Sequence, residues 1–303
     1  MLLPLWGNHQ NQEVQAFQSL IISALAFSLM TVCVKKIGGR LPVAELIFIR
    51  SVISLAITRF LLKKQGVNPW GSNKKLLLIR GLAGTGALFC IFKALFSLPI
   101  ATATVIQYSY PTFTAIAAKI FLKESIRKRI LIALILGWIG ITLVAQPLKN
   151  NSLNLGMPIF ALGIALIGAI LTAFAYVCVR KLSEREHPLV IVHYFPLISA
   201  PICLPILLAE GVLPTEGEWI WLLGIGLFTQ IGQQCITDGL RLLPAAHASS
   251  INYTQVIFAA IWGVLIFAEP LNRYLLSGAI CVFGATLISV SARADLDLVI
   301  GSK

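Results

Sequence analysis

Two side chains of opposite charge occupy corresponding positions in two long apolar segments. Lys93 lies in segment 76–97 and Asp238 in segment 218–240, and the two positions are 145 residues apart. An ionisable group at membrane depth is costly unless it is paired or hydrated, so it is a candidate for a functional role. We hypothesise that both face a shared cavity, where they bind a charged or zwitterionic substrate or couple its movement to protons. Alternatively, each side chain extends to the nearer water interface.

Uncharged polar side chains form a second group of candidates for substrate binding. One set recurs at i, i+3, i+4 and i+7, which is one face of a helix: Gln230, Gln233, Gln234 and Thr237. A second set lies in two further apolar segments: Gln107, Tyr108, Tyr110, Thr112, Asn252, Tyr253 and Gln255. A polar stripe on an apolar helix should not face lipid, so these residues either line a cavity or hydrogen-bond neighbouring helices together.

Four more charged residues lie in or beside the apolar segments. Arg50 is about a third of the way into segment 43–62 and needs a partner from another helix or water, so it either docks helices or contacts a substrate. Arg80, at the start of its segment, fits an interfacial anchor better. Glu124 and Glu269 each end a segment, and we expect them to fix helix ends or hold the basic loops.

These residues are positioned by apolar segments that are long enough to cross a bilayer. Hydrophobic residues make up 57 % of the chain and charged residues 12 %, with a mean hydropathy of +0.86. A soluble domain carries about 25 % charged residues. Ten stretches of about 20 residues match the bilayer core: 17–34, 43–62, 76–97, 100–118, 130–146, 157–179, 189–208, 218–240, 245–267 and 274–291. The sequence therefore predicts an all-α integral membrane protein with ten transmembrane helices.

The chain also repeats itself. Residues 95–113 align with 240–258 without a gap, and eight of the 19 positions are identical. We expect a first five-span repeat over 1–146, a linker over 147–156, a second repeat over 157–291 and a cytoplasmic tail over 292–303. Because five is odd, the second repeat must enter the membrane from the opposite side, which predicts two inverted halves around a central cavity.

The distribution of basic residues predicts the orientation. With a cytoplasmic N-terminus, 17 of the 24 Lys and Arg residues fall in inside segments and six in outside segments. The positive-inside rule then places both termini in the cytoplasm. We expect a multi-pass protein of a bacterial-type plasma (inner) membrane. The net charge of +12 reflects this topology and not nucleic-acid binding.

Several short motifs occur in a characteristic order. They are Pro42-x-x-Glu45-x-x-x-x-Arg50, Arg80-Gly81, Ala94-Leu95-x-x-Leu98-Pro99-x-Ala101-x-Ala103, Pro111, Leu122-x-Glu124, Gly239-Leu240-x-x-Leu243-Pro244-x-x-x-Ala248 and Glu269-Pro270. With the duplication, they make the chain resemble the drug/metabolite transporter superfamily, specifically its EamA-like ten-span members. The resemblance implies an inverted five-plus-five helix bundle that carries small metabolites through a central cavity. Lys93 departs from the family, whose members often have an aromatic residue there.

Together these features favour a secondary transporter that moves a small polar or amphipathic metabolite, amino-acid-like or related, by alternating access. The expected partners are this substrate, the lipid bilayer, and a proton or counter-substrate as candidate for coupling. No cofactor or nucleic acid is expected. A channel or a non-transporting membrane scaffold is the alternative, although no segment resembles a selectivity filter. An intramembrane enzyme is a weaker alternative, because no acidic cluster or metal motif appears.

Overall fold

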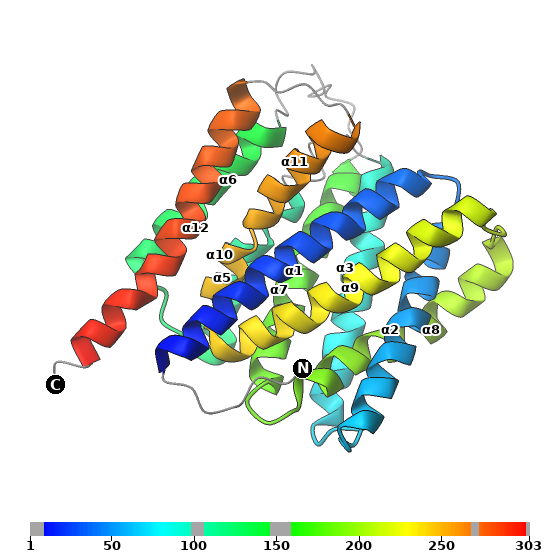
Figure 1. Ribbon diagram of the computed structural model, residues 1–303, viewed down its shortest axis with the longest axis horizontal. Coiled ribbons are helices and arrows are strands. Elements are labelled where there is room, and N and C mark those ends of the chain that lie inside the picture. The colour runs from blue at the N-terminus through cyan, green and yellow to red at the C-terminus, as the bar shows by residue number, and fades with distance from the viewer. Residues whose placement is uncertain (1–8, 98–105, 146–158, 268–272, 301–303) are drawn as a thin grey trace.

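The computed structural model describes residues 9–97, 106–145, 159–267 and 273–300, which form helices and no strand. Successive long helices run in opposite directions along the bundle (Figure 1). In chain order the elements are α1 (His9–Ile37), α2 (Val43–Lys64), α3 (Lys74–Ser97), α5 (Tyr110–Ala117), the π-helix η1 (Ala118–Leu122), α6 (Lys128–Ala145), α7 (Ile159–Leu182), α8 (Pro188–Glu210), α9 (Glu216–Leu242), α10 (Ala245–Ile251), α11 (Thr254–Phe267) and α12 (Arg273–Ile300).

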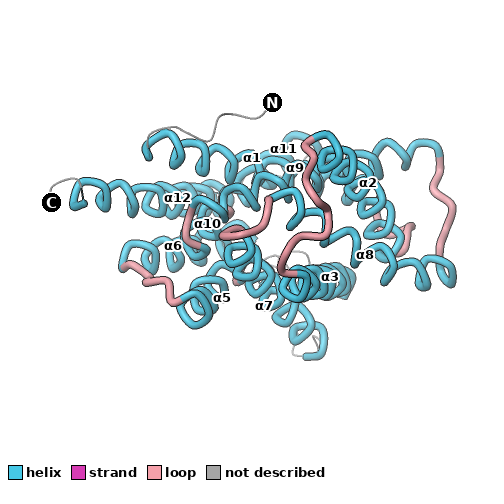
Figure 2. The backbone as a smooth tube through the Cα atoms, turned by 90° about the horizontal axis from the view of Figure 1, so that it is seen from below, coloured by secondary structure: helices cyan, strands magenta, loops and turns pink. Residues whose placement is uncertain are grey.

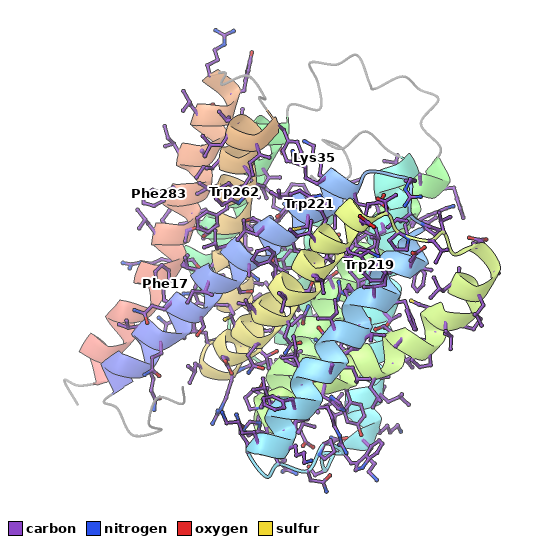
Figure 3. All side chains as sticks on the ribbon, turned by 45° about the vertical axis from the view of Figure 1, so that its right-hand side comes forward. Phe17, Lys35, Trp219, Trp221, Trp262 and Phe283 are labelled. Atoms are coloured by element: carbon purple, nitrogen blue, oxygen red, sulfur yellow. The ribbon has the colours of Figure 1, made fainter. Side chains whose placement is uncertain are left out.

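Apolar helices of membrane-spanning length confirm the prediction of a helical membrane protein. Within the described residues, five are long and apolar enough to cross a bilayer: Gln12–Ile37, Lys74–Ala94, Phe160–Leu182, Pro188–Glu210 and Ala245–Phe267. Large apolar side chains such as Phe283 and Trp219 point outward and are exposed, as contact with lipid requires (Figure 3). The full set of ten spans stays a prediction.

Four pairs of helices form the frame of the bundle, and each pair joins one helix before residue 146 to one after residue 157. The pairs are α1 with α9, α3 with α7, α2 with α8, and α6 with α12. The pair α6–α12 lies at one edge and α2–α8 at the other, with the remaining helices between them (Figures 1 and 2). The interior is therefore an interface between the two halves of the chain.

Two helices are interrupted at corresponding positions. Residues 108–109 form a turn before α5, and α10 and α11 are separated by a turn at residues 252–253. At the first break the Ser109 hydroxyl donates to the carbonyl of Ile106 at 2.5 Å. At the second, the Thr254 hydroxyl donates to the carbonyl of Ile251 at 2.7 Å. Because lipid offers no donors, these hydroxyls satisfy carbonyls at the breaks.

One end of the bundle carries the α2–α3 and α7–α8 loops, and we call it the basic end. Glu186, between α7 and α8, accepts hydrogen bonds from the Ser72 N–H (2.8 Å), the Ser72 hydroxyl (2.6 Å) and the Asn73 N–H (2.6 Å). Burial alone would raise the pKa of Glu186, but these hydrogen bonds outweigh it and lower the pKa below its ordinary value. The charged carboxylate therefore holds the start of α3 against the second half.

At the opposite end of the bundle, an ion pair and a hydrogen bond join the two halves. The Arg40 guanidinium, in the α1–α2 loop, pairs with Glu218 in the first turn of α9. Glu218 also accepts a hydrogen bond from the Thr215 N–H at 2.7 Å. In addition, Glu45 of α2 accepts a hydrogen bond from the Val212 N–H at 3.0 Å. Both ends of the α2–α8–α9 region are thus tied across the halves.

Some sequence expectations fall outside the described residues, namely the linker 147–156, Glu269 and the Leu98-Pro99 motif. Helix α12 continues through residues 292–300 to Ile300, and the cytoplasmic position of this tail stays a prediction.

Gly140 permits the close approach of α6 to α12 and gives a test of this packing. A Cβ atom there would lie 2.8 Å from the Gly278 carbonyl oxygen and 2.9 Å from the Val282 nitrogen, both backbone atoms. Because backbone cannot move without separating the helices, Gly140→Ala should lower the free energy of unfolding by about 1–3 kcal/mol. Thermal unfolding in detergent measures this. Gly163→Ala, which meets nothing within 4 Å, is the control; equal midpoints for the two variants would contradict the packing.

Candidate functional site

A cavity of about 310 Å³ lies between the two halves of the bundle. Its lining comes from helices of both halves, and the volume suits a small-molecule ligand. Most of its wall is apolar, and its polar lining residues are Thr31, Arg50, Arg80, Gln107, Tyr108, Tyr110, Thr172, Tyr176, Gln233 and Gln255.

Two arginines contact one aromatic ring in this cavity. The guanidinium carbons of Arg50 (α2) and Arg80 (α3) each lie 5.0 Å from the centroid of the Phe195 ring (α8). The two residues are only 3 % and 4 % exposed. Gly84 makes room for the ring, because a Cβ atom there would lie 2.9 Å from Phe195. Cation–π contacts of this kind contribute up to about 2 kcal/mol when desolvated.

Within the part of the chain that the structure describes, no carboxylate cancels the positive charge of this pair, because none lies within ion-pair distance of either guanidinium. Arg80 Nη2 donates to Gln233 Oε1 at 3.0 Å, whereas its Nε and Nη1 atoms are buried without a hydrogen-bond partner among the described residues. Because both guanidinium carbons lie 5.0 Å from the same ring centroid, the distance between them is at most twice that value. At an effective dielectric constant of about 20 they repel by roughly 1.7 kcal/mol or more.

A cluster of tyrosines forms another part of the wall. The Tyr110 ring lies 6.3 Å from Tyr108 and packs edge-on against Tyr176 at 5.4 Å, measured between centroids. The Asn252 side chain lies beside the Tyr110 hydroxyl. Because tyrosine combines an apolar ring with a hydroxyl, this wall can contact both the apolar and the polar parts of a ligand.

The cavity is closed toward the basic end and extends toward the opposite end. Its lining runs from Arg80 to Ala94 along α3, and on α7 it reaches Tyr176 but not the last turn. On α1 it is confined to the second half, from Phe27 to Val34. Arg80 and Tyr176 therefore lie at the floor.

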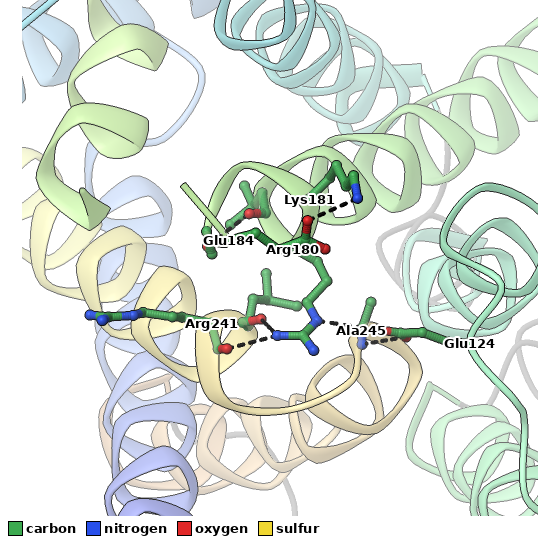
Figure 4. A network of polar contacts seen from close by, with 9 residues as sticks. Glu124, Arg180, Lys181, Glu184, Arg241 and Ala245 are labelled. Atoms are coloured by element: carbon green, nitrogen blue, oxygen red, sulfur yellow. Dashed lines mark hydrogen bonds and ion pairs between the residues drawn. The ribbon is translucent and has the colours of Figure 1, made fainter. Parts of the chain in front are cut away.

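Below this floor, a polar network joins the halves at the basic end (Figure 4). Arg180 Nε donates to Glu124 Oε1 at 3.1 Å, and Arg180 Nη1 donates to the Arg241 carbonyl at 2.7 Å. The Ala245 N–H donates to Glu124 Oε2 at 3.0 Å. Lys123, in the left-handed conformation with φ 57°, turns the chain so that Glu124 reaches these partners. The expectation that Glu124 fixes helix ends is confirmed, and we call this set the basic-end network.

The structure brings six of the predicted site residues to the cavity: Arg50, Gln107, Tyr108, Tyr110, Gln233 and Gln255. The others do not line it: Lys93, Thr112, Gln230, Gln234, Thr237, Asp238, Asn252 and Tyr253. Placement alone does not test binding, so the roles of all these residues stay predictions.

The shared cavity expected for Lys93 and Asp238 is not the cavity found. Lys93 is exposed. It lies 13 residues after Arg80 on α3, which rotates it by roughly 220° around the helix axis and away from the cavity. The Asp238 carboxylate lies 3.4 Å from the amide of Gln234, one turn earlier on α9.

The remaining predicted residues are packed between helices. Gln230 and Thr237 are buried, and the Thr237 hydroxyl donates to the Gln233 carbonyl at 2.7 Å. Tyr253 is fully buried against Gly137 of α6, where a Cβ atom would lie 2.4 Å from its ring. Asn252 is likewise buried at the break between α10 and α11. The stripe on α9 thus avoids lipid, and Gln233 alone of its members reaches the cavity.

Sequence reasoning missed several cavity residues, among them Arg80, Tyr176 and Phe195. Arg80 is six residues into α3 and resembles an interfacial anchor until the helices are packed. Aromatic residues in apolar helices carry no signal of their own. Gln255, by contrast, is among the polar candidates predicted from the sequence, and the repeat offset pairs it with Tyr110, which also lines the cavity.

A cavity between membrane-spanning helices, with a polar floor and contributions from both halves, defines a helical membrane protein built to bind a small molecule. The chain belongs to the EamA-like transporter family, whose profile matches residues 16–146 and 159–291. Transport of small metabolites is the activity that this family membership supports.

Named relatives and a solved structure agree with this assignment. The chain is 28 % identical over 268 residues to the pseudopaline exporter CntI of Pseudomonas aeruginosa, covering 88 % of this chain and 93 % of the exporter. It is 28 % identical to human solute carrier family 35 member G1, covering 88 % and 76 %. A solved crystal structure superposes with a TM-score of 0.82 at 16 % identity, over 93 % of this chain and 98 % of the other, which shows the fold.

The uncancelled charge gives a prediction for stability. Arg50→Met should raise the free energy of unfolding of the ligand-free protein by about 1–2 kcal/mol, because it removes a buried charge and its repulsion with Arg80. Thermal unfolding in detergent is the measurement. Arg59→Met, at an exposed position of the same helix, should stay within about 0.5 kcal/mol. A lower midpoint for Arg50→Met would mean that the contact with Phe195 outweighs the cost of the buried charge and its repulsion.

Proposed function

We propose that this protein is a secondary transporter and not an enzyme, moving a small polar or amphipathic metabolite, amino-acid-like or related, by alternating access. The cavity between the halves, closed at the basic end, is the observation that carries the proposal. The driving force is the substrate gradient, exchange against a counter-substrate, or a proton gradient. The printed functions of the relatives, an exporter and a solute carrier, support transport as the activity.

The packing of the helices supports two inverted five-span halves. The repeat offset relates α1 to α7, α2 to α8, α3 to α9, and α6 to α12. A twofold operation then converts the pair α1–α9 into α7–α3 and leaves α2–α8 and α6–α12 unchanged, and these are the pairs that pack. The breaks before α5 and between α10 and α11 correspond in the same way. Discontinuous helices at a repeat interface are a frequent feature of substrate sites in secondary transporters.

Residues that the repeat offset relates lie in different surroundings. This asymmetry is expected of a conformation in which the cavity is closed at one end only. Tyr108 lines the cavity, whereas its counterpart Tyr253 is packed against α6. In the alternate conformation, these environments exchange. The basic-end network must then open, and Lys35, the counterpart of Arg180, lies at the opposite end, where its ammonium is 4.1 Å from the centroid of Phe267.

The orientation follows from the charges at the two ends. The basic end carries the loops that are richest in Lys and Arg, so we place it in the cytoplasm together with both termini, in a bacterial-type inner membrane. The conformation described here then has its cavity directed toward the outer face.

Counterflow in proteoliposomes tests the transport function. Vesicles that contain the purified protein are loaded with a pooled metabolite mixture, and mass spectrometry identifies what exchanges. Saturable exchange of one class of compound is the expected result. Flux that does not saturate would indicate a channel. No exchange from folded protein, with and without an imposed proton gradient, would contradict the proposal.

The basic-end network gives a prediction for the conformational change. Glu124→Gln removes the charge that pairs with Arg180 and should weaken the closed state by about 1 kcal/mol, since hydrogen bonds to charged groups contribute about 1.5–3 kcal/mol and this pair is partly exposed. The readout is maleimide labelling of Cys178, which is 3 % exposed and lies between the cavity floor and Arg180 on α7, in a variant without the other cysteines. Labelling should become about fivefold faster.

Glu184→Gln is the matched control for this experiment. Glu184 pairs with Lys181 at the same end at 2.8 Å, but both side chains are about half exposed and the pair joins no second helix. Its removal should leave Cys178 labelling unchanged. Equal rates in wild type and Glu124→Gln would show that the network does not hold the basic end closed.

A further inference from the structure

We infer that the transported substrate is an organic anion, bound through a carboxylate or phosphate group by Arg50 and Arg80. The inference rests on the transport function proposed above and names its substrate class. Charge balance is the first argument. Both guanidiniums are more than nine-tenths buried and line the cavity, and no aspartate or glutamate is among the described residues that line it. Two cations held together in an apolar interior leave a strongly positive potential, which an anionic ligand would neutralise.

The hydrogen-bonding state of Arg80 is the second argument. Its Nε and Nη1 atoms are buried donors that find no acceptor in the described parts of the chain. Buried donors are nearly always satisfied in folded proteins, and an unsatisfied one requires an explanation. An oxyanion is a suitable acceptor, because guanidinium groups form short, strong hydrogen bonds to carboxylate and phosphate oxygens.

The neighbours of the two arginines hold them in place and leave their charge intact. Gln233 fixes the Arg80 side chain through a neutral amide oxygen at 3.0 Å, where a glutamate would have formed an ion pair. Phe195 contacts both guanidiniums with an uncharged ring. The site is therefore ordered before a ligand arrives, and its positive charge stays available.

The rest of the cavity indicates the remainder of the substrate. Tyr108, Tyr110 and Tyr176 offer hydroxyls on one part of the wall, and Leu88, Ile91 and Phe92 of α3 supply apolar surface. With about 310 Å³ available, the ligand is a small organic molecule with an apolar part and not an inorganic ion alone.

Binding to the purified protein in a neutral detergent tests the charge selectivity. The probes are succinate, its uncharged isostere succinamide, the dication of 1,4-diaminobutane, and glycerol phosphate. Titration calorimetry and thermal unfolding report binding. We expect succinate or glycerol phosphate to bind at least tenfold more tightly than succinamide, with diaminobutane weakest. Preference between the first two separates a carboxylate from a phosphate site. Equal or tighter binding of the neutral or cationic probe would overturn the inference.

Three substitutions test the residues. Arg50→Gln and Arg80→Gln should each lose at least tenfold in anion affinity. Gln233→Glu keeps the hydrogen bond to Arg80 but cancels its charge, so it should lose anion affinity while the protein remains at least as stable. Controls are Arg59→Gln on α2 and Lys75→Gln on α3, both at exposed positions, which should bind as wild type does. If the arginine variants fail to fold, the anion affinity of Gln233→Glu and the charge selectivity of the wild type still test the inference. An unchanged anion affinity in Gln233→Glu would overturn it.

Counterflow with the same probes separates this inference from the transport proposal. Exchange of succinamide or diaminobutane without exchange of either anion would retain the transporter and overturn the anion inference. Arginine-dependent binding of an anion without any exchange would uphold the anion site and contradict transport. Exchange of an anion that is lost in Gln233→Glu and kept in Lys75→Gln would support both.

Discussion

A lipid bilayer offers no hydrogen bonds to the chain inside it, and this constraint governs the structure. The backbone is satisfied within helices wherever it is regular. At the two positions where helices are interrupted, Ser109 and Thr254 supply hydroxyls to nearby carbonyls. Both interruptions lie at the interface between the halves and not on the lipid face. These two interruptions lie in the region that also holds the cavity, so the same constraint favours recognition of a ligand there.

The floor of the cavity holds two buried charges in an otherwise apolar interior, and residues of four helices keep them in place. Arg50, Arg80 and Phe195 come from three helices, and Gln233 comes from a fourth. None of these contacts cancels the two charges, so the protein gives up stability at this place. The protein tolerates this loss of stability because polar contacts elsewhere hold the two halves together. Examples are the hydrogen bond between Glu186 and Ser72 and the ion pair between Arg40 and Glu218. A site that is poor for stability is often good for binding.

The sequence predicts the helices well and the faces of those helices poorly. Long apolar runs and an offset of 145 residues are enough to predict a helical membrane protein with a duplicated plan. Gln107, Tyr108 and Tyr110 could be predicted as cavity residues because polar side chains in an apolar segment need polar surroundings. Lys93 and Arg80 show the limit. Both are cations on α3, and only the packing of α7, α8 and α9 decides that Arg80 faces the interior while Lys93 lies on the exposed side.

The two uncancelled charges also determine how electrical work enters a transport cycle. A membrane potential acts on each elementary charge with about 2.3 kcal/mol per 100 mV. Under the proposed function, an empty protein carries the charges of Arg50 and Arg80 through its conformational change, whereas a protein loaded with a divalent anion is neutral at that place. The potential then acts on the return of the empty protein and leaves the loaded step nearly unaffected. Cells could therefore set the rate of such a carrier through their energisation, without any coupling ion in the cavity.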